Sequence, residues 1–257
     1  MAKKKYYDLS VPVGDWTPDW MGHHFAQDTC LQRVHRHEIP IEPGLSRQVS
    51  EYIGIWHKGT HLDGPTHHEE GATTCDKIPL DRFYGTGVIV DFRYMKKWQI
   101  VTAKDLENAK PKIEEGDIVL MNTGWHHYWR VNDYVYYNHY PGMYTEAGEW
   151  LLAKRVRMVG GTWGATDGPL CHYPLRIDNL YHGLWDEYMQ ETGKDADKEF
   201  PDYEPCHQIF SSNMIPAIEN LGGEIDDVTG MRCTIAAFPY RFADPGHMVR
   251  VVAIVDK

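Results

Sequence analysis

Residues 57–69, HKGTHLDGPTHHE, place four histidines and two carboxylates among two glycines and a proline. Two neutral imidazoles and one carboxylate form a good ligand set for Zn²⁺, Mn²⁺ or Fe²⁺. In an extended strand, His57, His61 and Asp63 would share one face, because side chains alternate with a period of two. Gly59 would lie on the same face and leave room for an ion between the two rings. The spacing therefore predicts a metal site.

The chain after these residues is expected to turn back over the site. Pro65 cannot donate to a β ladder, so Gly64-Pro65 should end the strand and let His67 return to the same pocket. A helix would also place His57 and His61 together, but the glycines and the proline disfavour one. Ordinary surface or core histidines are the alternative, and that alternative would be preferred for an isolated pair. The density of ligand types in one short stretch favours the metal site.

Hydrophobic patterning predicts the elements that must position these side chains. Runs rich in valine and isoleucine predict six strands, at residues 51–63, 86–92, 116–124, 155–161, 232–238 and 249–256. Two helices are predicted, at 102–110 with a Thr-x-x-Asp capping box and at 145–156 with a threonine cap. Alternation of strand, helix and strand predicts an α/β fold in which the helices are crossovers.

Length and composition narrow the classes of protein and partner. The 257 residues carry a net charge of −11, which argues against nucleic acid or an anionic membrane, because both reward clustered basic charge. The N-terminal segment lacks the apolar core of a signal peptide, and no apolar run approaches the roughly 20 residues that cross a bilayer. Five scattered cysteines favour a reducing cytoplasm. We expect one domain, 1–257, in which residues 171–206 lose the apolar rhythm and form a long irregular lid or oligomer arm.

The motif HKGTHLDGPTHH resembles, at every fixed position, the His-x-Gly-Thr-His-x-Asp-x-Pro-x-His signature of the cyclase family of metal-dependent hydrolases. That family includes bacterial kynurenine formamidase, isatin hydrolase and a trans-dienelactone hydrolase. Three later stretches are also similar to the family: KIPLDRFYGTGVIVDF (77–92), LLAKRVRMVGGTWGATDG (151–168) and HQIFSSNMIPAIENL (207–221). The resemblance covers most of the chain from about residue 50 onward.

The resemblance implies a single α/β domain with mixed sheets and crossover helices, like the swivelling β/β/α fold of the family. It also implies a metal site with five protein ligands: His57, His61, Asp63, His207 and Glu219. In formamidase-like members such a set holds two zinc ions that share the aspartate, so we expect one or two ions of zinc or manganese. His67 matches the position of the general acid/base. We further expect a homo-oligomer, either a dimer or a tetramer.

The region of the second motif departs from the family pattern. Family members often carry Gly-x-Asp-x-x-Ser-x-Asp where this chain has GGTWGATD (160–167). Asp167 matches the last position, but Thr162 and Ala165 replace the earlier aspartate and the serine. Trp163 is expected to supply a substrate contact in place of the two missing side chains.

Two further residues are expected to bind the substrate. Trp125 stands in the aromatic stretch TGWHHYW (123–129), which could line the substrate pocket or simply pack beneath the surface. Arg176 could receive a substrate carboxylate through two hydrogen bonds, with an ordinary salt bridge as the alternative. The partner implied by these residues is a small molecule.

The chemistry that we expect is hydrolysis of a C–N amide bond in a small aromatic or cyclic molecule, with His67 as general acid/base and metal-activated water. A lactone is the alternative substrate. Non-haem iron oxygenases also use two histidines and one carboxylate, but usually place the first histidine two positions from the acid and the second far downstream. A non-catalytic protein with a metal pocket is the third reading, and the intact ligand set argues against it.

Overall fold

The fold is built on one mixed sheet. The computed structural model describes residues 3–14, 16–18, 31–38, 44, 46–172 and 182–256. Nine strands pair in the order β1-β11-β9-β5-β6-β7-β8-β4-β10. The neighbours from β5 to β8 are parallel, and the strands on both sides of them are antiparallel. The predicted single mixed α/β domain is thus confirmed.

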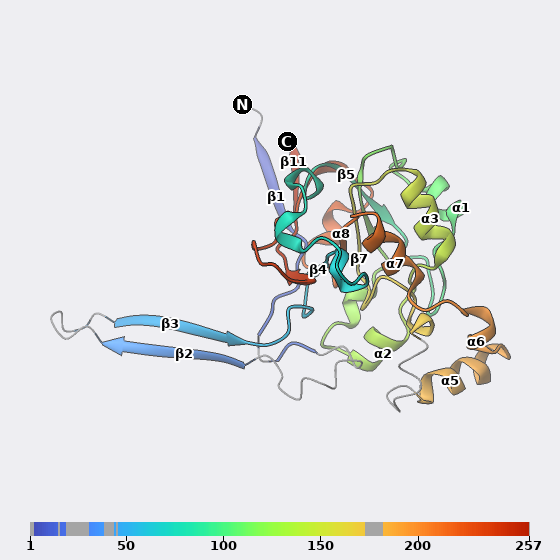
Figure 1. Ribbon diagram of the computed structural model, residues 1–257, viewed down its shortest axis with the longest axis horizontal. Coiled ribbons are helices and arrows are strands. Elements are labelled where there is room, and N and C mark those ends of the chain that lie inside the picture. The colour runs from blue at the N-terminus through green and yellow to red at the C-terminus, as the bar shows by residue number, and fades with distance from the viewer. Residues whose placement is uncertain are drawn as a thin grey trace.

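The strands of this sheet are β1 (Lys4–Asp8), β4 (His61–Asp63), β5 (Tyr84–Asp91), β6 (Ile118–Asn122), β7 (Met158–Gly161), β8 (Ala217–Glu219), β9 (Arg232–Ala236), β10 (Gly246–Met248) and β11 (Val252–Asp256). The α-helices are α1 (Ala103–Asn108), α2 (Asp133–Asn138), α3 (Thr145–Ala153), α5 (His182–Thr192), α6 (Ala196–Glu199), α7 (Pro205–Ser212) and α8 (Ile225–Val228). The 3₁₀ helices are η1 (Pro65–His67), η2 (Cys75–Lys77), η3 (Leu80–Arg82), η4 (Trp125–Tyr128) and η5 (Pro169–Cys171). Helices α1, α3 and α7 each connect two parallel strands, and α3 packs against both of the others (Figure 1).

Alternate residues of the parallel strands pack on opposite faces of the sheet. On β5, Val88 and Val90 belong to a core cluster that also contains Leu106 of α1 and Leu151 of α3. Ile89, between them, belongs to a second cluster on the other face, and β6 and β7 alternate in the same way. Both faces of these strands are therefore covered, which explains why their sequences read as nearly continuous apolar runs.

Most of the predicted elements are present. Five of the six predicted strands are confirmed as β5, β6, β7, β9 and β11, and the two predicted helices as α1 and α3. Thr102 forms the expected capping box of α1. The predicted cap of α3 is wrong, because the N-cap is Tyr144, whose side chain makes no cap. The predicted strand 51–63 is also wrong as a single element, because one strand ends at Ile53 and β4 begins only at His61.

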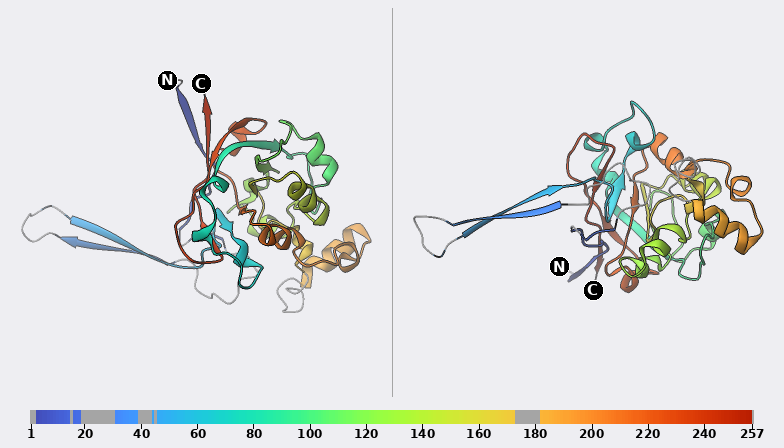
Figure 2. Two further views of the ribbon diagram at one scale, coloured as in Figure 1. Left: turned by 45° about the horizontal axis from the view of Figure 1, so that its top comes forward. Right: turned by 90° about the horizontal axis from the view of Figure 1, so that it is seen from below.

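A long hairpin stands apart from the sheet. Strands β2 (Leu31–Glu38) and β3 (Ser46–Ile53) pair antiparallel and extend away from the body of the molecule (Figures 1 and 2). A two-stranded hairpin alone is at best marginally stable in water. The expected dimer or tetramer stays a prediction.

The predicted excursion, 171–206, is only partly described. Residues 173–181 lie outside the described part of the chain, and helices α5 and α6 occupy most of the remainder. Trp185 and Tyr188 of α5 pack with Trp98 in a small apolar cluster that is separate from the two sheet cores. The role of this segment as a lid or an oligomer arm stays a prediction. In the described part of the chain, no helix has the length and apolar content that crossing a membrane requires.

Candidate metal centre

His57, His61 and Asp63 converge although they do not share one strand. The chain turns between the two histidines because Gly59 adopts a left-handed conformation with φ +63°. Within the turn, Gly59 O lies 2.8 Å from His61 Nδ1. His57 Nε2 lies 3.3 Å and His61 Nε2 3.5 Å from Asp63 Oδ1. β alternation places His61 and Asp63 on one face of β4, as expected, whereas the glycine turn brings His57 to them.

Two glycines make room for this arrangement. A Cβ atom at Gly59 would lie 2.4 Å from a methyl carbon of Val13, so this glycine permits close packing and does not provide the gap between imidazoles that the sequence suggested. On β10, which pairs with β4, a Cβ atom at Gly246 would lie 2.4 Å from His57 Nε2. A larger residue at position 246 would therefore displace the His57 ring. No sequence motif indicated this requirement.

The two distant residues implied by the family resemblance reach the same point. Glu219 ends β8 opposite His61, and its Oε2 lies 3.4 Å from His61 Nε2. His207 lies in the first turn of α7, with its Nε2 3.1 Å from Glu219 Oε1 and 3.7 Å from Asp63 Oδ2. Three imidazoles and two carboxylates thus form one cluster, in which only His57 is more than slightly exposed.

Asp167 holds His207 in position. The N-cap residue of α7, Glu204, makes no side-chain cap. Instead, the buried carboxylate of Asp167 accepts hydrogen bonds from the backbone N–H groups of Cys206 and His207, at 2.9 and 3.0 Å. The same carboxylate lies 2.6 Å from His207 Nδ1. This bond orients the ring so that Nε2 faces Glu219 and Asp63, which is how carboxylates commonly support a ligating histidine.

The cluster fits a divalent ion by its spacing. Ligand atoms about 2.1 Å from a tetrahedral zinc ion lie about 3.4 Å from one another, and the nitrogen–oxygen separations here run from 3.1 to 3.7 Å. Neither oxygen of Asp63 accepts a hydrogen bond from any described residue, a costly state for a buried carboxylate. Asp63 Oδ1 faces His57 and His61 while Oδ2 faces His207, as a carboxylate shared between two ions would.

The protonation states show the same need for a cation. Burial would lower the pKa of His61, but Asp63 and Glu219 outweigh burial and raise it to about 9. Burial also opposes the rise in the pKa of His207, which Asp167 and Glu219 raise well above its ordinary value. Burial and Asp63 would raise the pKa of Glu219, but His207 and His61 lower it to about 2. The protein alone therefore balances two carboxylates with two imidazolium groups, whose protons a bound cation would displace.

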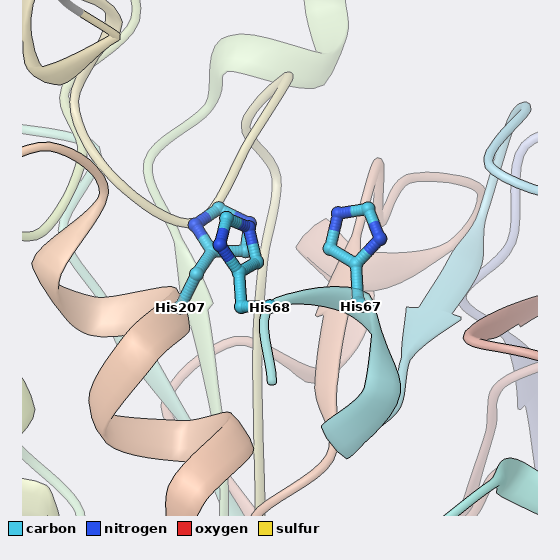
Figure 3. Close-up of side chains that lie close together, drawn as sticks. All are labelled: His67, His68 and His207. Carbon is cyan, nitrogen blue, oxygen red and sulfur yellow. The ribbon is translucent and has the colours of Figure 1, made fainter. Parts of the chain in front are cut away.

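His67 lies beside the cluster, where its geometry suits either a ligand or a proton carrier. Its ring stacks on that of His57 with centroids 4.4 Å apart, and it is close enough to His57 and Asp63 to share an ion with them. Burial lowers the pKa of His67 to about 3 against the opposing effect of Asp63, so the ring is neutral. The three rings in Figure 3 neighbour one another, and that of His68 lies 4.8 Å from the ring of His67 and 4.7 Å from the ring of His207, measured between centroids. Its role as general acid/base stays a prediction.

The cluster opens into a cavity of about 220 Å³. Its wall includes residues that the sequence did not single out: His68, Tyr137, His172, Tyr203 and Glu204. Glu204 lies 2.5 Å from His172 Nδ1 and 2.9 Å from His68 Nε2, measured to its two carboxylate oxygens. Of these residues, only His68 could have been suspected from the sequence, because it follows His67. Nothing in the irregular segment indicated Glu204. Within the described residues, no lysine or arginine lines the cavity.

The structure does not bring the two predicted substrate-binding tryptophans to this cavity. The Trp163 side chain is fully buried and packs over Gly161 in the helix-side core. Trp125 belongs to the same core, and its Nε1 donates to the carbonyl of Val135 at 3.1 Å. Core packing accounts for both indoles, which are therefore not part of the pocket wall. Arg176 lies outside the described residues.

Known proteins resemble this chain in sequence and in structure. The family model described as "Putative cyclase" matches residues 7–167. The kynurenine formamidase of Bordetella avium (strain 197N) is 26% identical over 160 residues, which cover 61% of this chain and 68% of that protein. That of Salinibacter ruber (strain DSM 13855 / M31) is 32% identical over 84 residues, covering 33% and 37%. Isatin hydrolase A from Ralstonia solanacearum superposes with a TM-score of 0.73 at 20% identity, over 98% of this chain and 92% of that one.

These relatives confirm two parts of the resemblance seen in the sequence. Kynurenine formamidases and isatin hydrolase are among them, whereas none of these relatives is a dienelactone hydrolase, so that part is unsupported. The family match includes the motif at 57–67 but ends before His207 and Glu219, whose place in the site rests on geometry alone. Because the match at residues 7–167 extends over more than half of the sequence, the chain belongs to the family described as "Putative cyclase".

Proposed function

We propose that this protein is a metal-dependent hydrolase that cleaves the C–N bond of a small aromatic or cyclic amide. The observation that carries the proposal is the meeting of three imidazoles and two carboxylates, spaced to hold a divalent ion, at the edge of a cavity. A divalent ion in such a site lowers the pKa of water to about 7 and polarises a carbonyl group. The kynurenine formamidases and isatin hydrolase among the relatives support an amide as the substrate.

The ligands that we assign to one or two ions are His57, His61, Asp63, His207 and Glu219. Five protein ligands are too many for one tetrahedral zinc with an open position, and the two oxygens of Asp63 face different imidazoles. Both observations favour two ions. A mixture of imidazole and carboxylate ligands suits zinc and manganese alike. The backbone N–H of Thr166 donates to Glu219 Oε1 at 2.5 Å, which helps to fix the direction of that carboxylate.

His67 is the residue that we expect to move the proton. Amide hydrolysis joins the oxygen of water to the carbonyl carbon, breaks the C–N bond and delivers a proton to the departing nitrogen. His67 lines the cavity and is neutral. From this position it would take a proton from the attacking water and return it to the leaving nitrogen, a role that typically contributes 10²–10⁴-fold to the rate.

The cavity sets limits on the substrate. A volume of about 220 Å³ admits a molecule of one or two rings, below the usual range of pockets for drug-sized ligands. No lysine or arginine of the described chain lines it, so within the described part of the wall the bound ions would be the positive partners of a substrate carboxylate. Two tyrosines, Tyr137 and Tyr203, offer aromatic surface. A small ring amide fits both the size of the cavity and this aromatic surface.

Metal analysis combined with hydrolysis assays tests the proposal. The purified protein should contain close to one or two equivalents of zinc or manganese and should hydrolyse formanilides or cyclic imides, with turnover lost on chelation and restored by metal. Dienelactones serve as the comparison that distinguishes amide from ester cleavage. A metal-free protein that gains no activity from either ion would contradict the proposal, and faster turnover of the lactones would reassign the bond.

A further inference from the structure

His68 and Glu204 form a part of the cavity wall that the metal centre does not use. Glu204 is 5% exposed, and its two carboxylate oxygens take up the Nε2 atom of His68 and the Nδ1 atom of His172. Burial would raise the pKa of Glu204, but His172 and His68 lower it well below its ordinary value. Glu204 is therefore an ionised carboxylate that accepts one hydrogen bond from each imidazole.

The backbone of Glu204 shows that this placement is costly. Glu204 has φ +43°, a left-handed conformation that residues other than glycine, asparagine and aspartate rarely adopt. It stands at the N-cap position of α7, yet Asp167 supplies the cap while the Glu204 side chain turns to the cavity. A residue with a strained backbone, whose side chain lines a pocket and does not cap its own helix, is a candidate for a functional role.

Glu204 also determines which nitrogen of His68 carries the proton. A carboxylate can only accept, so Nε2 of His68 must carry the N–H, and Nδ1 is the nitrogen left to act as an acceptor when the ring carries one proton. Nδ1 makes no hydrogen bond to any described residue, and the ring lines the cavity 4.7 Å from that of His207 (Figure 3). The cavity wall next to the metal centre therefore presents a ring nitrogen that can accept a hydrogen bond from a bound molecule.

We propose that His68 is a substrate-binding residue that accepts a hydrogen bond from the N–H of the scissile amide, and that Glu204 is the positioning residue that keeps its ring and tautomer in place. The inference rests on the proposed amide hydrolysis and narrows its substrate class to amides that keep an N–H. Such a contact also holds the leaving nitrogen near His67, the neighbouring residue in the chain. An N-alkylated amide or a lactone of the same shape lacks the donor and should bind less well.

A pair of cyclic substrates tests this directly. A lactam or cyclic imide with an N–H is compared with its N-methyl derivative, because the ring fixes the amide geometry in both. The wild-type protein should prefer the N–H compound. His68→Gln keeps a carboxamide N–H for Glu204 but removes the Nδ1 acceptor, so kcat/KM for the N–H compound should fall about tenfold, the value of one hydrogen bond, mainly through KM. The N-methyl compound should be nearly unaffected.

Glu204→Gln is the matching test of the positioning role. A carboxamide cannot accept from both imidazoles with its two terminal atoms, so one ring must reverse its tautomer, and the preference for the N–H compound should weaken. Glu199→Gln is the control, since Glu199 lies nearby on α6 as an exposed carboxylate paired with Lys194. It should leave both rate constants and the preference unchanged. Metal content should be that of the wild type in all three variants.

Each contrary result has a distinct meaning. Unchanged preference for the N–H compound in His68→Gln overturns the inference. So does loss of metal from that variant, because His67, His68 and His207 lie close enough together to hold an ion and His68 would then be a ligand. A wild-type protein that hydrolyses neither compound contradicts the proposed function instead. In that case, calorimetric binding of the same two compounds to the wild type and His68→Gln still decides whether His68 recognises the N–H.

Discussion

Two adjacent histidine pairs in this chain look alike in sequence but have contrasting surroundings. His67–His68 ends and follows the 3₁₀ helix η1, and His126–His127 lies within the 3₁₀ helix η4. Each pair has a carboxylate close enough to share an ion with at least one of its rings, Asp63 for the first and Asp226 for the second. Composition and spacing therefore do not distinguish the two.

The difference lies in how each carboxylate is already satisfied. Asp226 Oδ1 accepts hydrogen bonds from Asn122 at 2.8 Å and from Arg93 at 3.3 Å. Its Oδ2 lies 2.9 Å from His127 Nε2, whose side chain is 65% exposed. Asp63, in contrast, is buried and accepts no hydrogen bond from a described residue. A carboxylate with an arginine and an amide as hydrogen-bond partners is already satisfied, whereas a buried one that faces only imidazoles at 3.3 to 3.7 Å would gain from a metal ion between them.

The largest expected effect follows from removing the unsatisfied carboxylate. Asp63→Asn replaces the shared ligand by a neutral, weaker one, so metal content should fall to near zero and kcat/KM by at least ~10³-fold, since the ion contributes several kcal/mol to the transition state. Metal analysis and turnover check the result. Asp226→Asn is the matched control at the second pair and should keep both. Equal losses of metal and turnover in the two variants would show that Asp63 and Asp226 do not differ in their need for a metal ion.

His67→Ala should have the next largest effect. If His67 carries the proton, the variant keeps its metal but loses at least ~10²-fold in kcat, the low end for a general acid/base. His67 also lies close enough to His57 and Asp63 to be a metal ligand, and the same measurements test that role. A variant that loses metal, and recovers normal turnover when metal is added back, would make His67 a ligand. His127→Ala, the same change in the exposed pair, should leave kcat and metal content unchanged.

Asp167→Asn should have a smaller effect, on metal affinity more than on turnover at saturating metal. The substitution keeps the size of the side chain, but the weaker acceptor orients His207 less firmly through Nδ1. Loss of such a supporting carboxylate typically costs 10–100-fold in metal affinity. Titration with a competing chelator measures the change. Unaltered affinity would show that the helix α7 alone fixes the His207 ring.

Features set by neighbouring residues could be predicted from the sequence, whereas contacts between segments far apart in the chain could not. The strands of the parallel core were predicted correctly because both of their faces are covered by apolar residues. Such strands appear in the sequence as nearly continuous apolar runs. His57, His61 and Asp63 were found from spacing, and strand alternation holds for His61 and Asp63 but not for His57, because Gly59 turns the chain. Glu204 could not be found, because it reaches His68 across more than 130 residues of chain from an irregular segment.

The two tryptophans were misplaced for a related reason. Trp125 and Trp163 stand beside motifs, and large amphipathic rings suit pockets as well as cores. What decided their location was space elsewhere in the fold: Gly161 lacks a side chain, and the Trp163 ring fills that position. Nothing close in sequence distinguishes an indole that lines a pocket from one that covers a glycine on a sheet.

The smallest expected effect concerns the second pair, where we predict a pH-dependent contribution to stability and none to catalysis. Burial and His127 lower the pKa of His126 to about 4, against the opposing effect of Asp226. The unfolded chain takes up a proton at His126 near its ordinary pKa of about 6.5, while the folded protein does not. The wild type should therefore lose stability from this residue as the pH falls from about 6.5 towards 4.

His126→Gln lacks that proton uptake, so the difference in unfolding free energy between wild type and variant should shrink by ~1–3 kcal/mol over this window. Denaturant unfolding at several pH values measures it, with His127→Ala as the control expected to change stability by less than ~0.5 kcal/mol. A difference that stays constant with pH, or a loss of turnover in His126→Gln, would show that the second pair is not merely part of the packed surface.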